Sequence, residues 1–240
     1  MQKYSVFSLI KNAFSNHQNW EVAWKDPTPK SEYDVVIIGG GGHGLATAYY
    51  LAKEHNIRNV AIIEKGWIGG GNVGRNTTII RSNFMYDANA RFNEFGMDLW
   101  RNLSQELNFN VMFSPRGIIN LAHSDAQMNA YARRGNSMRL NGIDAKLLDR
   151  DEVKKLIPMA DFSDEVRFPI FGGLMQPSAG TARHDAVAWG YARQADDMGV
   201  DIIQHCEVTG FDVVNGKIKG IRTSRGDITV SYTHLTLPTT

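Results

Sequence analysis

The stretch VVIIGGGGHGLATAYY, from Val35 to Tyr50, joins an apolar, β-branched run to a helix-like pattern through four consecutive glycines. The β-branched run is typical of a strand buried on both faces of a parallel sheet. At the junction, Gly39, Gly41 and Gly44 fit the pattern G-x-G-x-x-G. A side chain would obstruct the tight turn at the first position, keep the backbone from a pyrophosphate at the second, and hold the helix off the strand at the third. The pattern therefore predicts phosphates at the positive end of the helix.

An acidic residue completes this motif. The run NVAIIEK, which starts at Asn59, predicts a second buried strand that ends at Glu64, twenty residues after Gly44. A carboxylate there can accept hydrogen bonds from both hydroxyls of a ribose, and it would repel a 2′-phosphate, which disfavours NADP. The order of strand, glycines, helix, strand and acid favours a dinucleotide site over a glycine-rich turn, but it leaves FAD and NAD both open.

The rest of the chain alternates between helical and strand-like patterns. Helical periodicity predicts helices over 87–107, 128–140, 149–157 and 184–198. Strands are predicted at 117–122, in VDIIQHCEV and in FDVVNGKIKGIRT, where Asn215-Gly216 is a favoured two-residue hairpin turn. These elements indicate a mixed α/β protein.

Composition excludes several classes of protein. The chain has 240 residues, 42% of them hydrophobic, and a net charge of +1, so neither nucleic acid nor an anionic membrane is an expected partner. Apolar runs are too short for a membrane span. The single cysteine, Cys206, fits a reducing compartment and a cytoplasmic location, and we interpret it as a buried structural thiol. The histidines lack the spacing of metal ligands, so no metal is predicted.

The composition also suggests boundaries. Residues 1–32 form an N-terminal extension and a proline-containing linker, with a weak amphipathic stripe that suits docking or disorder. Residues 33–230 form the main domain. Residues 231–240, SYTHLTLPTT, carry no charge and no clear periodicity. We expect this tail to lie outside the fold, either as non-native sequence or as a disordered end.

Four motifs carry a resemblance to a known family. They are GGGGHGLATAYYLAKEH, EKGWIGGGNVGRNTTIIRSN, GTARHDAVAW and GVDIIQHCEVTGF. The chain resembles the FAD-dependent amine oxidases of the D-amino-acid oxidase and sarcosine oxidase group, and more closely the beta subunits of heterotetrameric sarcosine oxidases, from about Tyr33 to Val230. The resemblance implies an α/β fold with a Rossmann-like FAD-binding domain of the GR2 type and the start of an α+β substrate domain.

The resemblance also implies residue roles for FAD. Gly42 and His43 would approach the pyrophosphate, and Glu64 would hold the adenosine ribose. The backbone of Val208 would contact the adenine. Arg81 is the catalytic candidate, because a guanidinium near a flavin ring stabilises the anionic reduced form. The path toward the flavin ring would be lined by Asn72, Arg75, Thr77 and Thr78.

A second flavin is implied as well. In that family the beta subunit carries FMN covalently bound to a histidine, near the interface with the large alpha subunit, and the matching residue here is His184. A neutral imidazole is a competent nucleophile toward the flavin 8-methyl group, and Arg183 could favour the developing flavin anion. From spacing alone, His184 is more simply a residue that opens a helix.

The implied activity is the oxidation of sarcosine to glycine. Electrons would pass from FAD to FMN and then to molecular oxygen, giving hydrogen peroxide, while the one-carbon unit goes to tetrahydrofolate in the partner subunit. The implied partners are the alpha, gamma and delta subunits. The alternatives are a single-flavin amine oxidase or dehydrogenase, a non-catalytic flavin-binding fragment, and an NAD-linked dehydrogenase. Family members continue past Val230, so we expect the chain to be the N-terminal part of the subunit and to be inactive alone.

Overall fold

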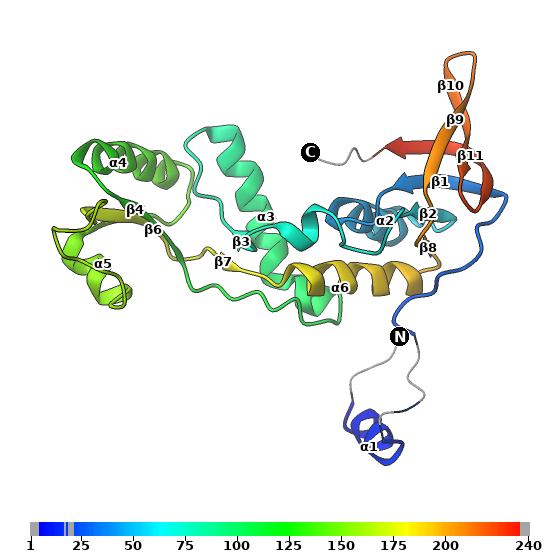
Figure 1. Ribbon diagram of the computed structural model, residues 1–240, viewed down its shortest axis with the longest axis horizontal. Coiled ribbons are helices and arrows are strands. Elements are labelled where there is room, and N and C mark those ends of the chain that lie inside the picture. Colours follow the sequence, from blue (N-terminus) through cyan, green and yellow to red (C-terminus); the bar gives the residue numbers. More distant parts are fainter. Residues whose placement is uncertain (1–4, 17, 19–21, 236–240) are drawn as a thin grey trace. The chain divides into compact units, whose positions relative to one another are not determined.

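The computed structural model describes residues 5–16, 18 and 22–235 (Figure 1). The chain forms two compact units built from alternating segments. Unit 1 comprises Met1–Asn76, Leu107–Val111 and His184–Thr240, and unit 2 comprises Thr77–Glu106 and Met112–Arg183. The stretch 33–230, which we treat as one domain in sequence, therefore contributes to both units.

Unit 1 is built on a six-stranded sheet with the order β8-β2-β1-β11-β10-β9. Its strands are β1 (Glu32–Ile38), β2 (Val60–Ile63), β8 (Asp201–Ile203), β9 (Val208–Val214), β10 (Lys217–Thr223) and β11 (Gly226–Leu235). Strands β8, β2, β1 and β11 run parallel to one another, whereas β9, β10 and β11 form an antiparallel meander. The predicted strand-helix-strand unit is confirmed, with Val35 paired to Val60.

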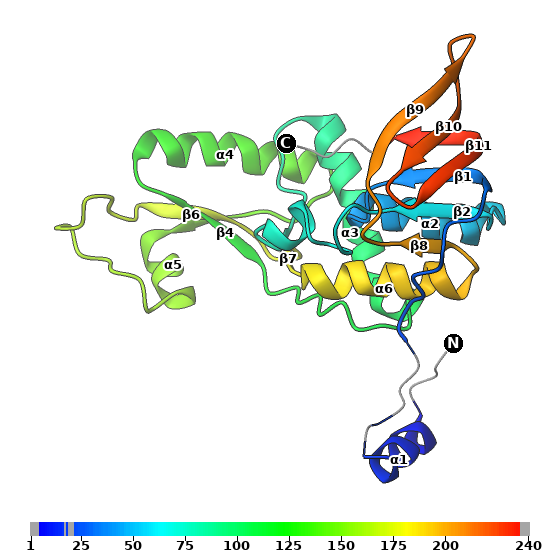
Figure 2. The same ribbon diagram turned by 45° about the vertical axis from the view of Figure 1, so that its right-hand side comes forward.

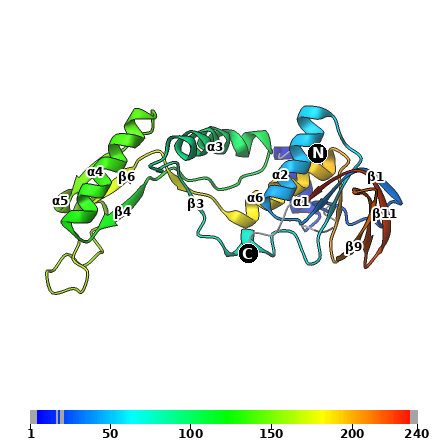
Figure 3. The same cartoon turned by 90° about the horizontal axis from the view of Figure 1, so that it is seen from above.

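Two helices of unit 1 lie side by side, α2 (Gly42–His55) and α6 (His184–Asp197) (Figure 3). Leu45 and Tyr49 of α2 are fully buried, as helical spacing predicts. Tyr33 of β1 is also buried, and its hydroxyl donates to Asp201 Oδ2 at 2.9 Å. Burial is the main cause that raises the pKa of Tyr33 to about 12. A short helix of the N-terminal extension, α1 (Val6–Phe14), has no buried residue.

The predicted hairpin forms between β9 and β10. Asn215 and Gly216 have φ angles of 52° and 74°, the left-handed values that a two-residue turn of this kind needs. The run VDIIQHCEV, predicted as one strand, is instead divided into β8 and β9. His205 breaks it with a φ of 49°, and its N–H donates to the Gly66 carbonyl at 2.9 Å.

The tail differs from our expectation. Strand β11 continues to Leu235, which pairs with Ile38 of β1. Residues 231–235 therefore belong to the sheet, and the expectation that they lie outside the fold is wrong. Residues 236–240 lie outside the described residues.

Unit 2 contains a three-stranded antiparallel sheet with the order β4-β6-β5, of which β4 and β6 are labelled in Figure 2. Its strands are β4 (Ile118–Ala122), β5 (Lys146–Asp149) and β6 (Gly172–Gln176), and a two-stranded ladder joins β3 (Ile79–Ile80) to β7 (Gly180–Thr181). Helices α4 (Asp125–Leu140) and α5 (Arg150–Leu156) contact β6, and α3 (Asp87–Glu106) follows β3 along the chain. None of the helices in the described residues is long and apolar enough to cross a membrane.

Strands β5 and β6 are absent from the sequence predictions. Two glycines, Gly172 and Gly173, open β6 and weaken its strand signal. A Cβ at Gly173 would lie 2.9 Å from the Asn120 carbonyl oxygen, so the neighbouring strand requires glycine there. Contact with β4 and β5, rather than local propensity, holds this segment extended.

Candidate cofactor-binding site

The glycine loop of unit 1 turns sharply from β1 into α2. Gly39 has a φ of 109°, and its N–H donates to the Ile63 carbonyl at 2.8 Å. A Cβ at Gly44 would lie 2.1 Å from the Gly39 carbonyl oxygen and 3.3 Å from Ile37 Cγ2. The first and third glycines therefore occupy the tight turn and the close helix-strand contact that the motif predicts.

The second glycine of the motif lies in a different environment. Gly41 is the N-cap of α2, with a φ of −83°, and no side chain caps this helix. A Cβ at Gly41 would meet only Val73 Cγ2, at 3.8 Å, and one at Gly42 would meet the same atom at 3.4 Å. The protein leaves room here, beside backbone N–H groups at the positive end of a 14-residue helix. This geometry fits a pyrophosphate, with His43 exposed on the first turn.

Glu64 is held at the end of β2 beside the same loop. Its Oε2 accepts from the Gly40 N–H and its Oε1 from the Gly66 N–H, both at 2.7 Å. Its backbone is fixed to β8 and to the segment after it, through Ile203 and Cys206. Each carboxylate oxygen has a second lone pair that can accept from a ribose hydroxyl. The link from Glu64 to the loop amides was missed by sequence reasoning, which cannot see which backbone groups approach the acid.

Glu64→Gln should weaken FAD binding. Glutamine offers one oxygen where glutamate offers two, so one backbone amide loses its acceptor. The ribose also loses a negatively charged acceptor. The expected cost is about 2–4 kcal/mol of FAD binding free energy. Titration of the full-length apoprotein with FAD measures the change. Glu54→Gln, at an exposed position on α2, is the matched control. Equal FAD affinity in the two variants would contradict the role of Glu64.

The glycine-rich segment after Glu64 packs back onto the loop. The Gly69 N–H donates to the Gly40 carbonyl at 3.0 Å, and Gly69 lies close to both Val73 and Ala188 of α6. Val73 belongs to the short helix η1 (Asn72–Arg75). The predicted residues Asn72 and Arg75 are both exposed, at its two ends. The structure thus brings this segment beside the glycine loop and α6.

His184 and Val208 lie elsewhere in unit 1. His184 is the first residue of α6 and is half-buried. Its Nδ1 is buried and has no hydrogen-bond partner among the described residues. Leaving a buried ring nitrogen without a hydrogen bond costs about 1–3 kcal/mol. We therefore expect either a bound group or a water molecule to contact this atom. Val208 begins β9, two residues after Cys206, and packs against the sheet core.

Four predicted residues lie in unit 2 on or beside the β3-β7 ladder. Thr78 has a φ of 61°, which is rare for a β-branched residue, and its carbonyl accepts from the Ala182 N–H at 3.1 Å. Thr77 and Arg183 flank this contact and are exposed. Backbone strain of this kind is often found at ligand sites.

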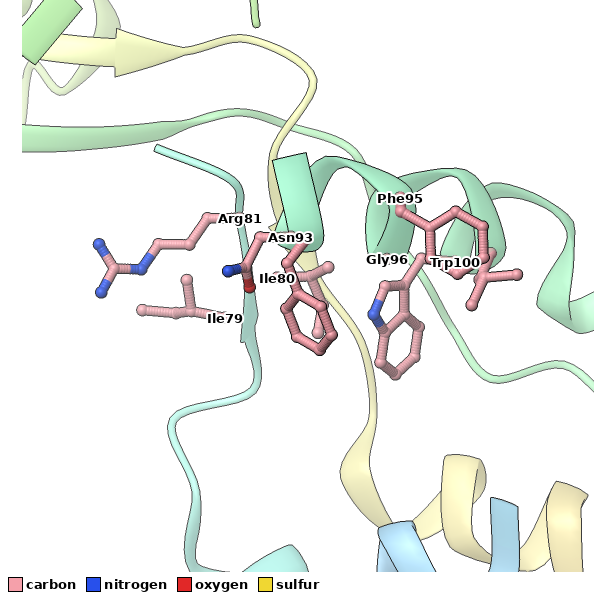
Figure 4. Close-up of a pocket in the computed structure, with 9 residues that line it drawn as sticks. Ile79, Ile80, Arg81, Asn93, Phe95, Gly96 and Trp100 are labelled. Atoms are coloured by element: carbon pink, nitrogen blue, oxygen red, sulfur yellow. The ribbon is translucent and has the colours of Figure 1, made fainter. Parts of the chain in front are cut away.

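Arg81, the fourth of these residues, lines a cavity of about 330 Å³ in unit 2. The other walls are mostly apolar and come from β3 and α3, including Phe92, Phe95 and Trp100. Figure 4 shows the Arg81 side chain extending alongside Ile79 and away from the Trp100 ring. In the described part of the chain, no three His, Cys, Asp or Glu side chains form a group that could hold a metal ion.

The comparisons with known proteins agree with this geometry. The family model described as FAD dependent oxidoreductase matches residues 34–235. The chain is 61% identical over 226 residues to the sarcosine oxidase subunit beta of Rhizobium meliloti (strain 1021), covering 94% of this chain and 54% of that protein. It is 52% identical over 208 residues to the protein of the same name from an Arthrobacter species, covering 87% of this chain and 51% of the relative. The chain spans about half the length of these curated relatives.

Solved structures show the same fold. The L-proline dehydrogenase from P. horikoshii superimposes with a TM-score of 0.79 at 29% identity, over 87% of this chain and 53% of that one. The glycine oxidase from Bacillus cereus gives a TM-score of 0.74 at 24% identity, over 85% of this chain and 54% of that one. The predicted α/β fold with an FAD-binding domain is confirmed.

Proposed function

Because the chain belongs to the FAD dependent oxidoreductase family, we propose that it forms the FAD-binding part of the beta subunit of a sarcosine oxidase. One observation carries the proposal: the uncapped N-terminus of α2 lies open beside a loop in which the Gly40 N–H donates to the Glu64 carboxylate. The similarity to two sarcosine oxidase beta subunits supports sarcosine as the substrate that the bound FAD would oxidise.

In this proposal the residues of unit 1 bind and orient the cofactor. Amides at the start of α2 hold the pyrophosphate, Glu64 holds the ribose, and Val208 lies beside the adenine. By the resemblance, Arg81 would provide positive charge for the reduced flavin. The FAD held by these residues would supply the acceptor for a hydride equivalent from the N-methyl carbon of sarcosine. Hydrolysis of the resulting imine, or capture of its carbon by tetrahydrofolate, leaves glycine.

The proposal includes a second flavin and partner subunits. His184 would hold FMN covalently, with Arg183 beside it, and the bound FMN would supply a route for electrons from FAD to molecular oxygen, which would give hydrogen peroxide. The unpartnered, buried Nδ1 of His184 supports a bound group at this position. The alpha subunit would bind tetrahydrofolate, and gamma and delta subunits would complete a heterotetramer. We also place the enzyme in the cytoplasm, in keeping with its buried free thiol at Cys206.

A single-flavin dehydrogenase is the second candidate. It is favoured by the fold and the 29% identity shared with the L-proline dehydrogenase structure. In that case FAD would be the sole flavin, and His184 would be a helix-opening residue. Reduced FAD would then pass its electrons to an acceptor other than FMN.

The test uses the full-length chain assembled with its partner subunits. We expect a yellow complex whose flavin is bleached by sarcosine without oxygen, and which then releases about one hydrogen peroxide per sarcosine in air. L-Proline is the matched control substrate, since it is also a secondary amine with a carboxylate. Bleaching by proline but not by sarcosine would favour the second candidate. A colourless complex would contradict both.

A further inference from the structure

A network of polar side chains surrounds Asn83 in unit 2. Asn83 is fully buried, and its Nδ2 donates to Asn120 Oδ1 at 2.7 Å. Its Oδ1 accepts from Arg81 Nη1 at 2.8 Å and from Arg134 Nη2 at 3.3 Å, while its backbone carbonyl accepts from Arg134 Nε at 2.6 Å. The bond to Asn120 fixes the amide so that its oxygen faces both guanidinium groups.

The chain on either side of Arg81 is also fixed. Ile80, before it, pairs with Gly180 in the β3-β7 ladder. Ser82, after it, is fully buried, and its N–H donates to Gln176 Oε1 at 3.0 Å. The Arg81 guanidinium lies 5.3 Å from the centre of the Phe84 ring. The position of the Arg81 backbone is therefore set by its neighbours, and the direction of its guanidinium is set by Asn83 and Phe84.

The charges in this network are unbalanced. Within the described residues, neither Arg81 nor Arg134 forms an ion pair with a carboxylate, and the acceptor that they share is a neutral amide. The nearby Glu94 instead accepts from Ser82 Oγ at 2.5 Å and from Arg101. Burial, and then the charge of Arg81, lower the pKa of Arg134. A neutral acceptor orients a guanidinium but leaves its charge in place, whereas a carboxylate would offset that charge.

We propose that Asn83 is a positioning residue that orients the Arg81 guanidinium and keeps its full positive charge available to the flavin. This inference rests on the proposed function, in which Arg81 acts near a flavin ring. Asparagine is suited to the task because it has an acceptor for the two arginines and a donor that Asn120 locks in place. Aspartate would accept the same hydrogen bonds but would neutralise part of the charge.

The test is the midpoint potential of FAD in the full-length protein, measured by chemical reduction without any amine. Every protein in the series carries His184→Ala, which leaves FAD as the flavin that is titrated. Asn83→Asp keeps the hydrogen bonds to both arginines, since the Asn120 amide can turn to donate. It should lower the affinity for reduced, anionic FAD about tenfold, which is a fall of about 30 mV for a two-electron couple. Asn83→Leu, which has a side chain of similar size, should lower the midpoint potential by a similar amount.

A double-mutant cycle separates positioning from general stability. Arg81→Leu should lower the potential by at least as much as Asn83→Leu, and adding Asn83→Leu to Arg81→Leu should change it no further, because leucine adds no charge of its own. Asn102→Asp, which adds the same charge at an exposed position of α3, should leave the potential unchanged. A fall that persists in the Arg81→Leu background, or an Arg81→Leu variant with the parent potential, would overturn the proposal.

The midpoint potential is measured without sarcosine, so it tests the role of Asn83 separately from the proposed substrate. If sarcosine fails to reduce the parent protein, the proposed function fails while the cycle still reports on Asn83 and Arg81. If sarcosine reduces the parent but the changes in potential caused by the Asn83 and Arg81 substitutions are additive, the proposed function stands and the positioning role is wrong. Thermal unfolding of each FAD-loaded variant checks that the Asn83 changes leave the fold intact.

Discussion

Gly41→Val in the full-length protein should abolish FAD binding while leaving the fold intact. A Cβ at Gly41 would meet only Val73 Cγ2, at 3.8 Å, and the φ of −83° suits any residue. The valine would instead fill the space through which backbone amides reach the pyrophosphate. We expect FAD affinity to fall more than about 100-fold, or about 2.7 kcal/mol, with an unchanged melting temperature of the apoprotein.

Gly44→Ala is the matched comparison from the same motif. Its Cβ would lie 2.1 Å from the Gly39 carbonyl oxygen, so α2 cannot keep its contact with β1. We expect about 3 kcal/mol of destabilisation, seen as a lower melting temperature of the apoprotein. A Gly41→Val protein as yellow as the parent would place the phosphate site elsewhere. A Gly44→Ala protein with the parent stability would contradict the close packing of α2.

His184→Ala in the full-length beta subunit should release the acid-stable flavin. Only a covalent bond keeps flavin on a protein through acid precipitation, because denaturation destroys every non-covalent site. In the parent, fluorescence should remain on the peptide TARHDAVAWGYAR. The alanine variant should lose this fluorescence, still allow sarcosine to reduce FAD, and form peroxide much more slowly. Because His184 Nδ1 has no hydrogen-bond partner in the described structure, the substitution breaks no bond at that atom.

The control for this prediction is His205→Asn. His205 is exposed and has a φ of 49°, a conformation that asparagine adopts readily. This variant should keep the acid-stable flavin. If the His184→Ala protein keeps it too, or makes peroxide at the parent rate, His184 is only a helix-opening residue and the single-flavin candidate takes its place.

Local patterns were enough to predict the framework of unit 1. The β-branched run before Gly39, the helical spacing after it and the position of Glu64 specify strand, turn, helix and strand through interactions between residues close in sequence. Asn215-Gly216 predicted the β9-β10 hairpin for the same reason, since the turn requires left-handed φ angles that these two residues tolerate.

Long-range contacts set the remaining features, and no local pattern encodes them. Strand β6 opens with two glycines and is extended because β4 and β5 pair with it. Ser82 beside Arg81 is held by Gln176, 94 residues away along the chain. The polar networks around Glu64 and Asn83 also depend on long-range contacts. The folded chain brings the Gly40 N–H to Glu64, and Asn120 and Arg134 to Asn83, and hydrophobic periodicity carries no information about these partners.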